Sequence, residues 1–217
     1  MEHQILVVGI GPGSREYMLP AAWEAIATAK TLVGGRRALE TLAPPEAKRR
    51  VVDADIEGLL NYIEEESRQG QVVVMVSGDP GFYSLLPALR RRFPRERLQV
   101  IPGISSVQLA FARVAEPWQD ASLLSFHGRE IADEVLLYRS GRMLSFLTDR
   151  LHRPKEIAER LLQLGWPETT LCWQCESLSY SAERVERSTL AKAAQQEGFA
   201  HAIFIVKADA GGEEEFA

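Results

Sequence analysis

The feature that most constrains the fold is the apolar run Gln71–Ser77 (QVVVMVS), which is followed at once by glycines and a proline. Its apolar residues are consecutive rather than alternating, so both faces of the strand that it predicts must be buried. Strands of this kind lie in parallel sheets that helices cover on both sides. The chain is therefore expected to be an α/β protein.

The rest of the first half alternates short apolar runs with segments of helical spacing. In the helix predicted over Ile56–Gln69, for example, the apolar residues fall on one stripe. This β-α-β-α order implies a mostly parallel sheet. Further strands are predicted at Gln4–Ile10, Thr31–Gly35 and Leu98–Ile101, and further helices at Ala21–Ala29, Phe82–Phe93 and Ser105–Val114.

A break at Ala115–Asp120 (AEPWQD) interrupts the pattern with a proline and two acidic residues. We place a domain boundary there, with an N-terminal α/β domain at residues 1–116 and a C-terminal α/β domain at residues 117–210. An acidic tail follows at residues 211–217. In the second domain, strands are predicted at Ser122–Phe126, Met143–Thr148, Leu171–Glu176 and Ala202–Val206, with a helix at Ile157–Leu164.

Composition and charge exclude several classes of protein. The net charge of -5 disfavours a nucleic-acid partner, which needs a broad positive surface. No apolar run reaches the roughly 18–20 residues of a membrane helix, and the polar N-terminus does not resemble a secretory signal. We expect a soluble cytoplasmic protein. Local arginines could still bind a small anion, although Arg90–Arg92 is better explained as a solvated helix face.

Cys172 and Cys175 are the chain's two cysteines, and they form a C-x-x-C pair within a predicted strand. Residues three apart in a strand point to opposite faces. The two thiols are therefore not expected to share a metal ion or to form a redox pair, and no metal site is predicted.

The first candidate site is the loop Gly9–Gly13 (GIGPG), directly after the first strand. Its third glycine comes one position too early for a dinucleotide-binding loop, and Pro12 removes an N–H that would hold phosphate. No acidic residue stands near the position that would contact a ribose, although Arg36-Arg37 keeps an NADP site open. A plain tight turn is the remaining interpretation.

Two more glycine-containing loops follow strands, at Val76–Tyr83 (VSGDPGFY) and Ile101–Ser106 (IPGISS). Asp79 could cap the helix that follows it, and so could Ser105. Because ligands of open α/β sheets bind at the carboxyl ends of strands, the three loops together predict one crevice. Backbone groups and hydroxyls suit a ligand with adenosine and amino-acid parts better than a triphosphate.

These motifs resemble the tetrapyrrole methylase family. The opening VVGIGPGSREYMLPAAWEAIATAKTLVGGRRAL resembles its first motif, and VSGDPGFYS resembles its Gly-Asp-Pro loop. The run VIPGISSVQLAFARVAEPWQDASLLSFHGR is most similar to the precorrin-6Y methyltransferase branch, in its C5-methylating subunit. LTD at residues 147–149 and CESLSYSAERVERSTL at residues 175–190 also match that branch, so the resemblance covers nearly the whole chain.

The resemblance implies two α/β domains with S-adenosylmethionine in the cleft between them, a mixed sheet in the second domain, and a homodimer. It implies C5 methylation of precorrin-7 or cobalt-precorrin-7 in cobalamin biosynthesis, with a separate subunit for C15 methylation and decarboxylation. Cys175-Glu176 stands where the family usually has Gly-Glu. Carried over by motif, the cofactor contacts are Gly11, Pro12, Gly78, Asp79, Phe82, Ser105, Ser106, Leu147, Cys175 and Ala202.

His127 and Arg129 follow a predicted strand end, where functional residues gather. His127 is a candidate proton carrier. Arg129 could hold a carboxylate of the substrate, and Tyr83 is a second candidate substrate contact. The alternative is that His127 and Arg129 only stabilise the domain junction.

Three other functions stay open. One is another enzyme of the same fold, such as a different precorrin methylase or diphthine synthase. The second is an NADP-dependent reductase that uses the first glycine loop. The third is a subunit that binds the cofactor without catalysis.

Overall fold

The computed structural model describes residues 3–209, so the expected acidic tail at residues 211–217 lies outside the described residues. The chain divides into two compact units between Ser105 and Ser106. Each unit contains one five-stranded sheet. Within the described residues, no helix is both long and apolar enough to cross a membrane.

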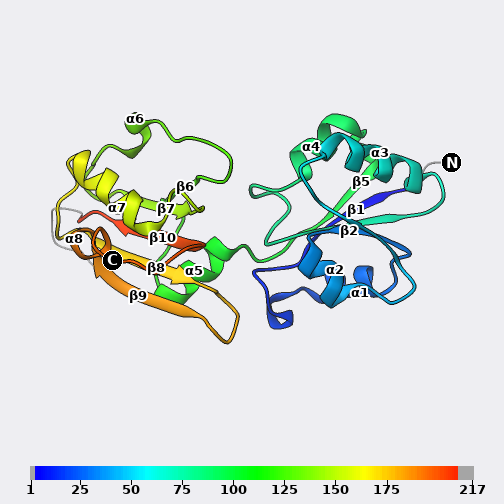
Figure 1. Cartoon of the computed structure of the whole chain (residues 1–217), viewed down its shortest axis with the longest axis horizontal. Coiled ribbons are helices and arrows are strands. Elements are labelled where there is room, and N and C mark those ends of the chain that lie inside the picture. The colour runs from blue at the N-terminus through cyan, green and yellow to red at the C-terminus, as the bar shows by residue number, and fades with distance from the viewer. Residues whose placement is uncertain (1–2, 210–217) are drawn as a thin grey trace. The chain divides into compact units, whose positions relative to one another are not determined.

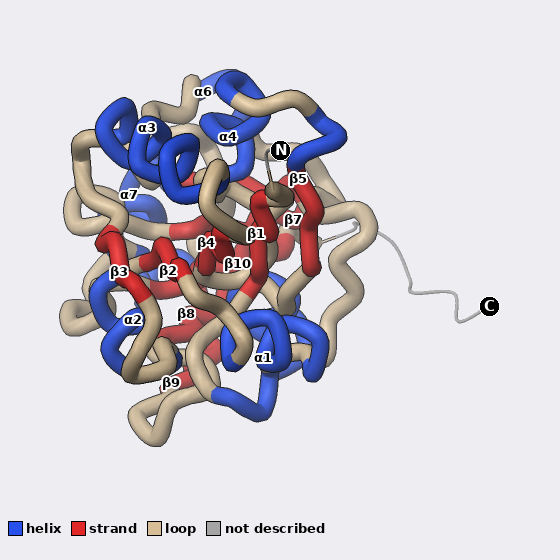
Figure 2. The backbone as a smooth tube through the Cα atoms, turned by 90° about the vertical axis from the view of Figure 1, so that its right-hand side faces the viewer, coloured by secondary structure: helices blue, strands red, loops and turns tan. Residues whose placement is uncertain are grey.

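The first unit is built on an entirely parallel sheet with the strand order β3-β2-β4-β1-β5. Figures 1 and 2 show helices α1 and α2 on one face of this sheet and α3 and α4 on the other. The strands are β1 (Ile5–Gly9), β2 (Thr31–Gly34), β3 (Lys48–Val51), β4 (Val72–Val76) and β5 (Leu98–Ile101). The helices are α1 (Pro20–Ala27), α2 (Arg36–Leu42), α3 (Ile56–Ser67) and α4 (Leu86–Arg92), with short 3-10 turns at Arg15–Tyr17 and Arg95–Arg97.

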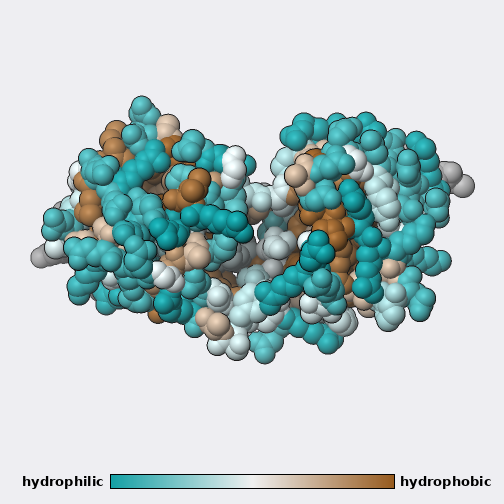
Figure 3. Space-filling view, viewed as in Figure 1, coloured by the Kyte–Doolittle hydropathy of each residue, from teal (hydrophilic) through white to brown (hydrophobic). Residues whose placement is uncertain are grey.

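Alternate residues of the central strands supply the two apolar cores of this unit. Ile5 and Val7 of β1 pack with Leu59 and Ile63 of α3. The residues between them belong to the core beneath α1 and α2, where Leu6 and Val8 lie near Ile26 and Leu39. All five residues of β4 are buried, as the continuous apolar run predicted. Figure 3 shows apolar residues gathered over the strands of this unit within a largely hydrophilic surface.

The second unit has a mixed sheet with the order β6-β7-β10-β8-β9. The β6–β7 pair is parallel, and the other pairs are antiparallel. The strands are β6 (Ser122–Ser125), β7 (Met143–Leu147), β8 (Leu171–Glu176), β9 (Arg184–Thr189) and β10 (Ala202–Lys207). The helices are α5 (Ser106–Val114), α6 (Asp133–Leu136), α7 (Pro154–Gln163) and α8 (Leu190–Ala193). Both sheets agree with the predicted α/β class.

One helix prediction is wrong at its start. A helix was expected over Phe82–Phe93, but α4 begins only at Leu86. Tyr83 has a φ of 47°, in the left-handed region, which no right-handed helix can contain. The segment before Leu86 is instead a turn, in which the Ser84 hydroxyl donates to the carbonyl of Pro80. Asp79 therefore does not cap a helix.

The division of the chain falls before α5, whereas the sequence predicted it after residue 116. Helix α5 contacts strand β10 of the second unit. Just beyond the helix, Glu116 forms an ion pair with Lys207 of β10, with Nζ and Oε2 2.9 Å apart. These contacts explain why the helix joins the later sheet.

Candidate functional site

Three loops of the first unit meet at one edge of its sheet. Strand β1 lies between β4 and β5, and all three run in the same direction, so their carboxyl ends are neighbours. The loops that follow them are 9–13, 76–83 and 101–105. None of these three segments contains a lysine or an arginine.

The first two loops are joined by backbone hydrogen bonds. Gly11 and Gly78 form an isolated antiparallel bridge, in which the Gly78 amide donates to the Gly11 carbonyl at 2.8 Å. The amide of Ile10 donates to the carbonyl of Val76 at 2.9 Å. Gly11 and Gly78 have φ values of 75° and 67°, which glycine adopts without strain.

Asp79 joins the second loop to the third. Its Oδ1 accepts from the amide of Gly81 at 2.8 Å, and its Oδ2 accepts from the amide of Gly103 at 3.0 Å. Because both oxygens accept backbone amides, the carboxylate holds two loops in place. We therefore assign a structural part in the site to Asp79. The sequence had predicted this residue as a cofactor contact.

The loops also touch through their backbones. A Cβ atom on Gly103 would lie 2.2 Å from the carbonyl oxygen of Gly78, and a Cβ on Gly9 would lie 2.6 Å from the same oxygen. Neither position has room for a side chain. Ser105 is buried and adjoins Gly78, since a Cβ atom on Gly78 would lie 3.4 Å from the Cα of Ser105.

The remaining predicted residues of the first unit lie on the same loops. Pro12 is half-buried beside Gly11. The rings of Phe82 and Tyr83 meet edge to face, with centroids 4.7 Å apart, and the Tyr83 side chain is exposed. Strained backbone at a bulky residue is common at functional sites, and Tyr83 lies beside the Asp79 turn.

In the second unit, the sheet brings three predicted residues together. Leu147 of β7 and Cys175 of β8 are both paired with Ile203 of β10, one on each side. Ala202 precedes Ile203, and its amide donates to the Thr148 hydroxyl at 2.8 Å. The Thr148 hydroxyl lies within hydrogen-bond distance of the carbonyl oxygens of Ala200 and Ala202.

Ser106, His127 and Arg129 also belong to the second unit, but they do not lie on the three strands that carry Leu147, Cys175 and Ala202. Ser106 is the first residue of α5. His127 and Arg129 are exposed on the loop after β6, where the amide of His127 donates to the Ser125 hydroxyl at 3.2 Å. The amide of Phe126, between them and the strand, donates to the carbonyl of Leu147 at 3.0 Å.

Two functional candidates that the sequence analysis missed follow β7. Asp149 is part of the LTD motif, for which no separate role was predicted. His152 belongs to none of the motifs. The ring Nδ1 of His152 lies 3.0 Å from Oδ1 of Asp149. An aspartate and a histidine three residues apart, directly after a strand, are the sequence signal that could have identified them.

The two cysteines lie on opposite faces of β8, as predicted. Cys172 belongs to the core with Leu144 and Phe204, whereas Cys175 is paired with Ile203 on the other face. Burial raises the pKa of both thiols to about 12, and the nearby Glu186 and Glu183 add to the shift. Both thiols are therefore neutral at pH 7.

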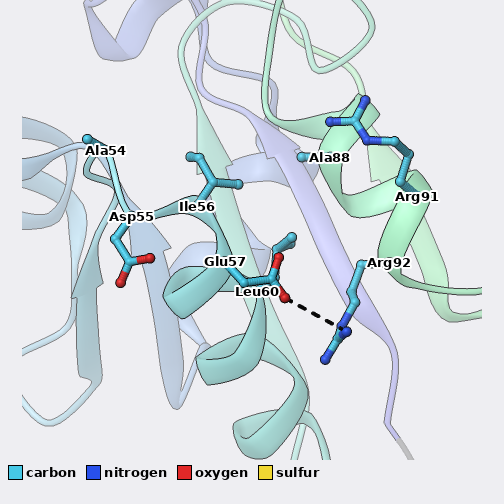
Figure 4. Close-up of a pocket in the computed structure, with 8 residues that line it drawn as sticks. All are labelled: Ala54, Asp55, Ile56, Glu57, Leu60, Ala88, Arg91 and Arg92. Atoms are coloured by element: carbon cyan, nitrogen blue, oxygen red, sulfur yellow. Dashed lines mark ion pairs between the residues drawn. The ribbon is translucent and has the colours of Figure 1, made fainter.

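A pocket of about 520 Å³ lies elsewhere in the first unit, between the start of α3 and the end of α4. Figure 4 shows Glu57 and Arg92 facing each other across it, with Oε1 and Nη1 4.0 Å apart. Arg92 also forms an ion pair with Glu64. The arginines at 90–92 are all exposed, as expected for a solvated basic helix face. None of the predicted site residues lines this pocket.

Comparison with known proteins identifies the class of protein that this fold and these loops define. The family model of the tetrapyrrole (corrin/porphyrin) methylases matches residues 4–194. The chain therefore belongs to the tetrapyrrole methylase family, which is a family of methyltransferases.

Two curated relatives and one solved structure are similar over most of this chain. The cobalt-precorrin-7 C(5)-methyltransferase of Salmonella typhimurium is 39% identical over 161 residues, 74% of this chain and 79% of the relative. The decarboxylating precorrin-6Y C(5,15)-methyltransferase of Sinorhizobium sp is 31% identical over 87% of this chain and 45% of its own length. The crystal structure of the precorrin-6Y methylase from Archaeoglobus fulgidus superposes with a TM-score of 0.71, at 29% identity, over 95% of this chain and 98% of that one.

Proposed function

We propose that this chain is an S-adenosylmethionine-dependent methyltransferase that methylates C5 of precorrin-7 or cobalt-precorrin-7 in cobalamin biosynthesis. The observation that carries the proposal is the 39% identity to a cobalt-precorrin-7 C(5)-methyltransferase across three quarters of the chain. The Salmonella relative is named for a cobalt-containing substrate and the Sinorhizobium relative for one without cobalt, so cobalt-precorrin-7 and precorrin-7 are both candidate substrates.

The loops of the first unit fit the cofactor by their chemistry. They offer backbone groups and the hydroxyl of Ser105, and they lack a basic side chain that would suit a triphosphate. Both oxygens of the one acidic side chain in these loops, that of Asp79, accept backbone amides. A neutral nucleoside with an amino-acid arm and a sulfonium matches this set of groups.

When bound, S-adenosylmethionine supplies a methyl group that the positive sulfur already activates. The chain's own task is to hold the donor and the acceptor carbon in line and to exclude water. We assign the loop residues Gly11, Pro12, Gly78, Phe82 and Ser105 to the cofactor, with Asp79 holding their loops. Ser106, Leu147, Cys175 and Ala202 are proposed as further cofactor contacts, and Arg129 and Tyr83 as substrate contacts.

The test is a calorimetric titration with S-adenosylhomocysteine, the product of the cofactor. We expect binding at roughly micromolar affinity, about -8 kcal/mol. NADPH is the control ligand, since a reductase would bind it instead. A folded sample that binds NADPH and releases no heat with S-adenosylhomocysteine would refute the proposal. Product formation is then measured by mass spectrometry, as the gain of one methyl group, with precorrin-7 and cobalt-precorrin-7 in parallel.

We also propose a cytoplasmic homodimer, with C15 methylation and decarboxylation carried by a separate subunit. The support is the family resemblance and the Sinorhizobium relative, of whose length the match covers 45%. Light scattering of the purified chain should give the mass of two chains. A monomer at micromolar concentration would contradict the dimer and leave the proposed chemistry unaffected.

A further inference from the structure

An aspartate–histidine pair lies in the loop after β7, next to residues of the loop that follows β6. These strands are parallel, so the loop after β6 and the loop after β7 leave the same edge of the sheet. The first loop contains Phe126 and Glu130, and the second contains Asp149 and His152. Carboxyl ends of parallel strands are where α/β proteins place ligands and reacting groups.

Asp149 determines which nitrogen of His152 carries hydrogen. Oδ1 of Asp149 accepts from the amides of Leu151 at 2.9 Å and His152 at 2.8 Å, and the ring Nδ1 of His152 lies 3.0 Å away. Burial alone would raise the pKa of Asp149, but these hydrogen bonds outweigh it and lower the pKa below its ordinary value. An ionised carboxylate only accepts, so Nδ1 of His152 is the donor. The lone pair of the neutral ring is then on Nε2.

Two further contacts hold the ring. Phe126 stacks on it, with centroids 4.3 Å apart and planes within 12° of parallel. Oε1 of Glu130 lies 3.8 Å from Nε2. A proton taken up at Nε2 would therefore give an imidazolium placed between two carboxylates, Asp149 and Glu130. The His152 side chain is 23% exposed, so the ring is not sealed in the core.

His127 compares poorly as a proton carrier. It is exposed, and only its backbone amide is held, by the Ser125 hydroxyl. Within the described residues, its ring makes no hydrogen bond or ion pair that would orient it. A base that is fixed in tautomer and direction loses less entropy in the transition state than a mobile one.

We propose that His152, oriented by Asp149, is the general base of the methyl transfer, and this inference rests on the proposed function. The bond between the acceptor carbon and the methyl carbon forms as the carbon–sulfur bond breaks, and its electron pair stays on sulfur as S-adenosylhomocysteine. The acceptor carbon then loses its hydrogen as a proton. Nε2 of His152 accepts that proton, and the electrons of the carbon–hydrogen bond return to the ring system.

The test compares the pH dependence of kcat in wild type, His152→Gln, His127→Gln and Asp149→Asn. We expect His152→Gln to lower kcat by about 10²- to 10⁴-fold and to remove the acid limb of the profile, with unchanged affinity for S-adenosylhomocysteine. His127→Gln should keep the limb. Asp149→Asn keeps an oxygen acceptor in the place of Oδ1 but removes the charge that stabilises the imidazolium, so the acid limb should move to lower pH.

Several outcomes would overturn the inference. His152→Gln with wild-type kcat and an intact acid limb would do so, and so would loss of the limb in His127→Gln alone. If His152→Gln does not fold, His152→Phe preserves the stack on Phe126, and the shift in Asp149→Asn is read in a protein with its native ring. A wild-type chain that binds no S-adenosylhomocysteine would refute the proposed function itself, whereas an active wild type with an equally active His152→Gln refutes only the role of His152.

Discussion

Replacing Gly103 by alanine is expected to destabilise the first unit by about 1–3 kcal/mol, in the range of overpacked cores. The new Cβ would lie 2.2 Å from the Gly78 carbonyl oxygen and 2.9 Å from the Gly9 Cα, so backbone rather than a flexible side chain must move. The displacement would separate the three loops. We therefore also expect weaker binding of S-adenosylhomocysteine.

The measurement is unfolding in urea, monitored by hydrogen exchange of the backbone amides in β1, β4 and β5. Exchange resolves the first unit by itself, which a single whole-chain transition would not do in a protein of two units. Gly35→Ala is the matched control, because an added Cβ there meets no atom within 4 Å and its φ is -61°. Equal protection in the two variants would show that the loops are not packed as described.

Replacing Asp79 by alanine should weaken binding of S-adenosylhomocysteine by about 10- to 100-fold. The substitution leaves the amides of Gly81 and Gly103 without their acceptor, and a hydrogen bond to a charged group contributes about 1.5–3 kcal/mol. Loss of these hydrogen bonds weakens ligand binding indirectly, because it changes the positions of the loops. Asp79→Asn should also bind weakly, since an amide nitrogen would face one of two amide donors.

The measurement is calorimetry at constant salt and pH, together with thermal unfolding to show that each variant folds. Asp53→Ala is the matched control, because the Asp53 carboxylate also accepts a backbone amide, that of Asp55 at 3.0 Å, but beyond the edge strand β3. We expect wild-type affinity in that variant. Wild-type affinity in a folded Asp79→Ala protein would contradict the part assigned to the carboxylate.

Much of the site could be predicted because two of its three loops follow fully buried strands. The apolar residues of β1 and β4 carry their own signal, since an uninterrupted run must be buried on both faces. The glycines that follow mark where each strand ends. The parallel order of the strands then brings the loop ends to one edge of the sheet, whichever residues fill the helices between them.

Two edge strands, β3 and β9, could not be predicted in the same way. Strands β3 (KRRV) and β9 (RVERST) are polar and partly exposed, because each lies at the border of its sheet. An edge strand gains its stability from backbone pairing with one neighbour, and charged side chains protect its free side. Such a strand has no apolar pattern of its own.

The amino-acid sequence by itself determined the α/β class, the three loops and the family, since apolar runs and glycine spacing are local properties of the chain. The tertiary structure decided what each polar group contacts. It showed that Asp79, an expected helix cap, links two loops, and it placed the ring of His152 against Phe126 and Glu130 of another loop. Hydrogen bonds and ring contacts of this kind join different loops, so they exist only after the strands that carry those loops have paired.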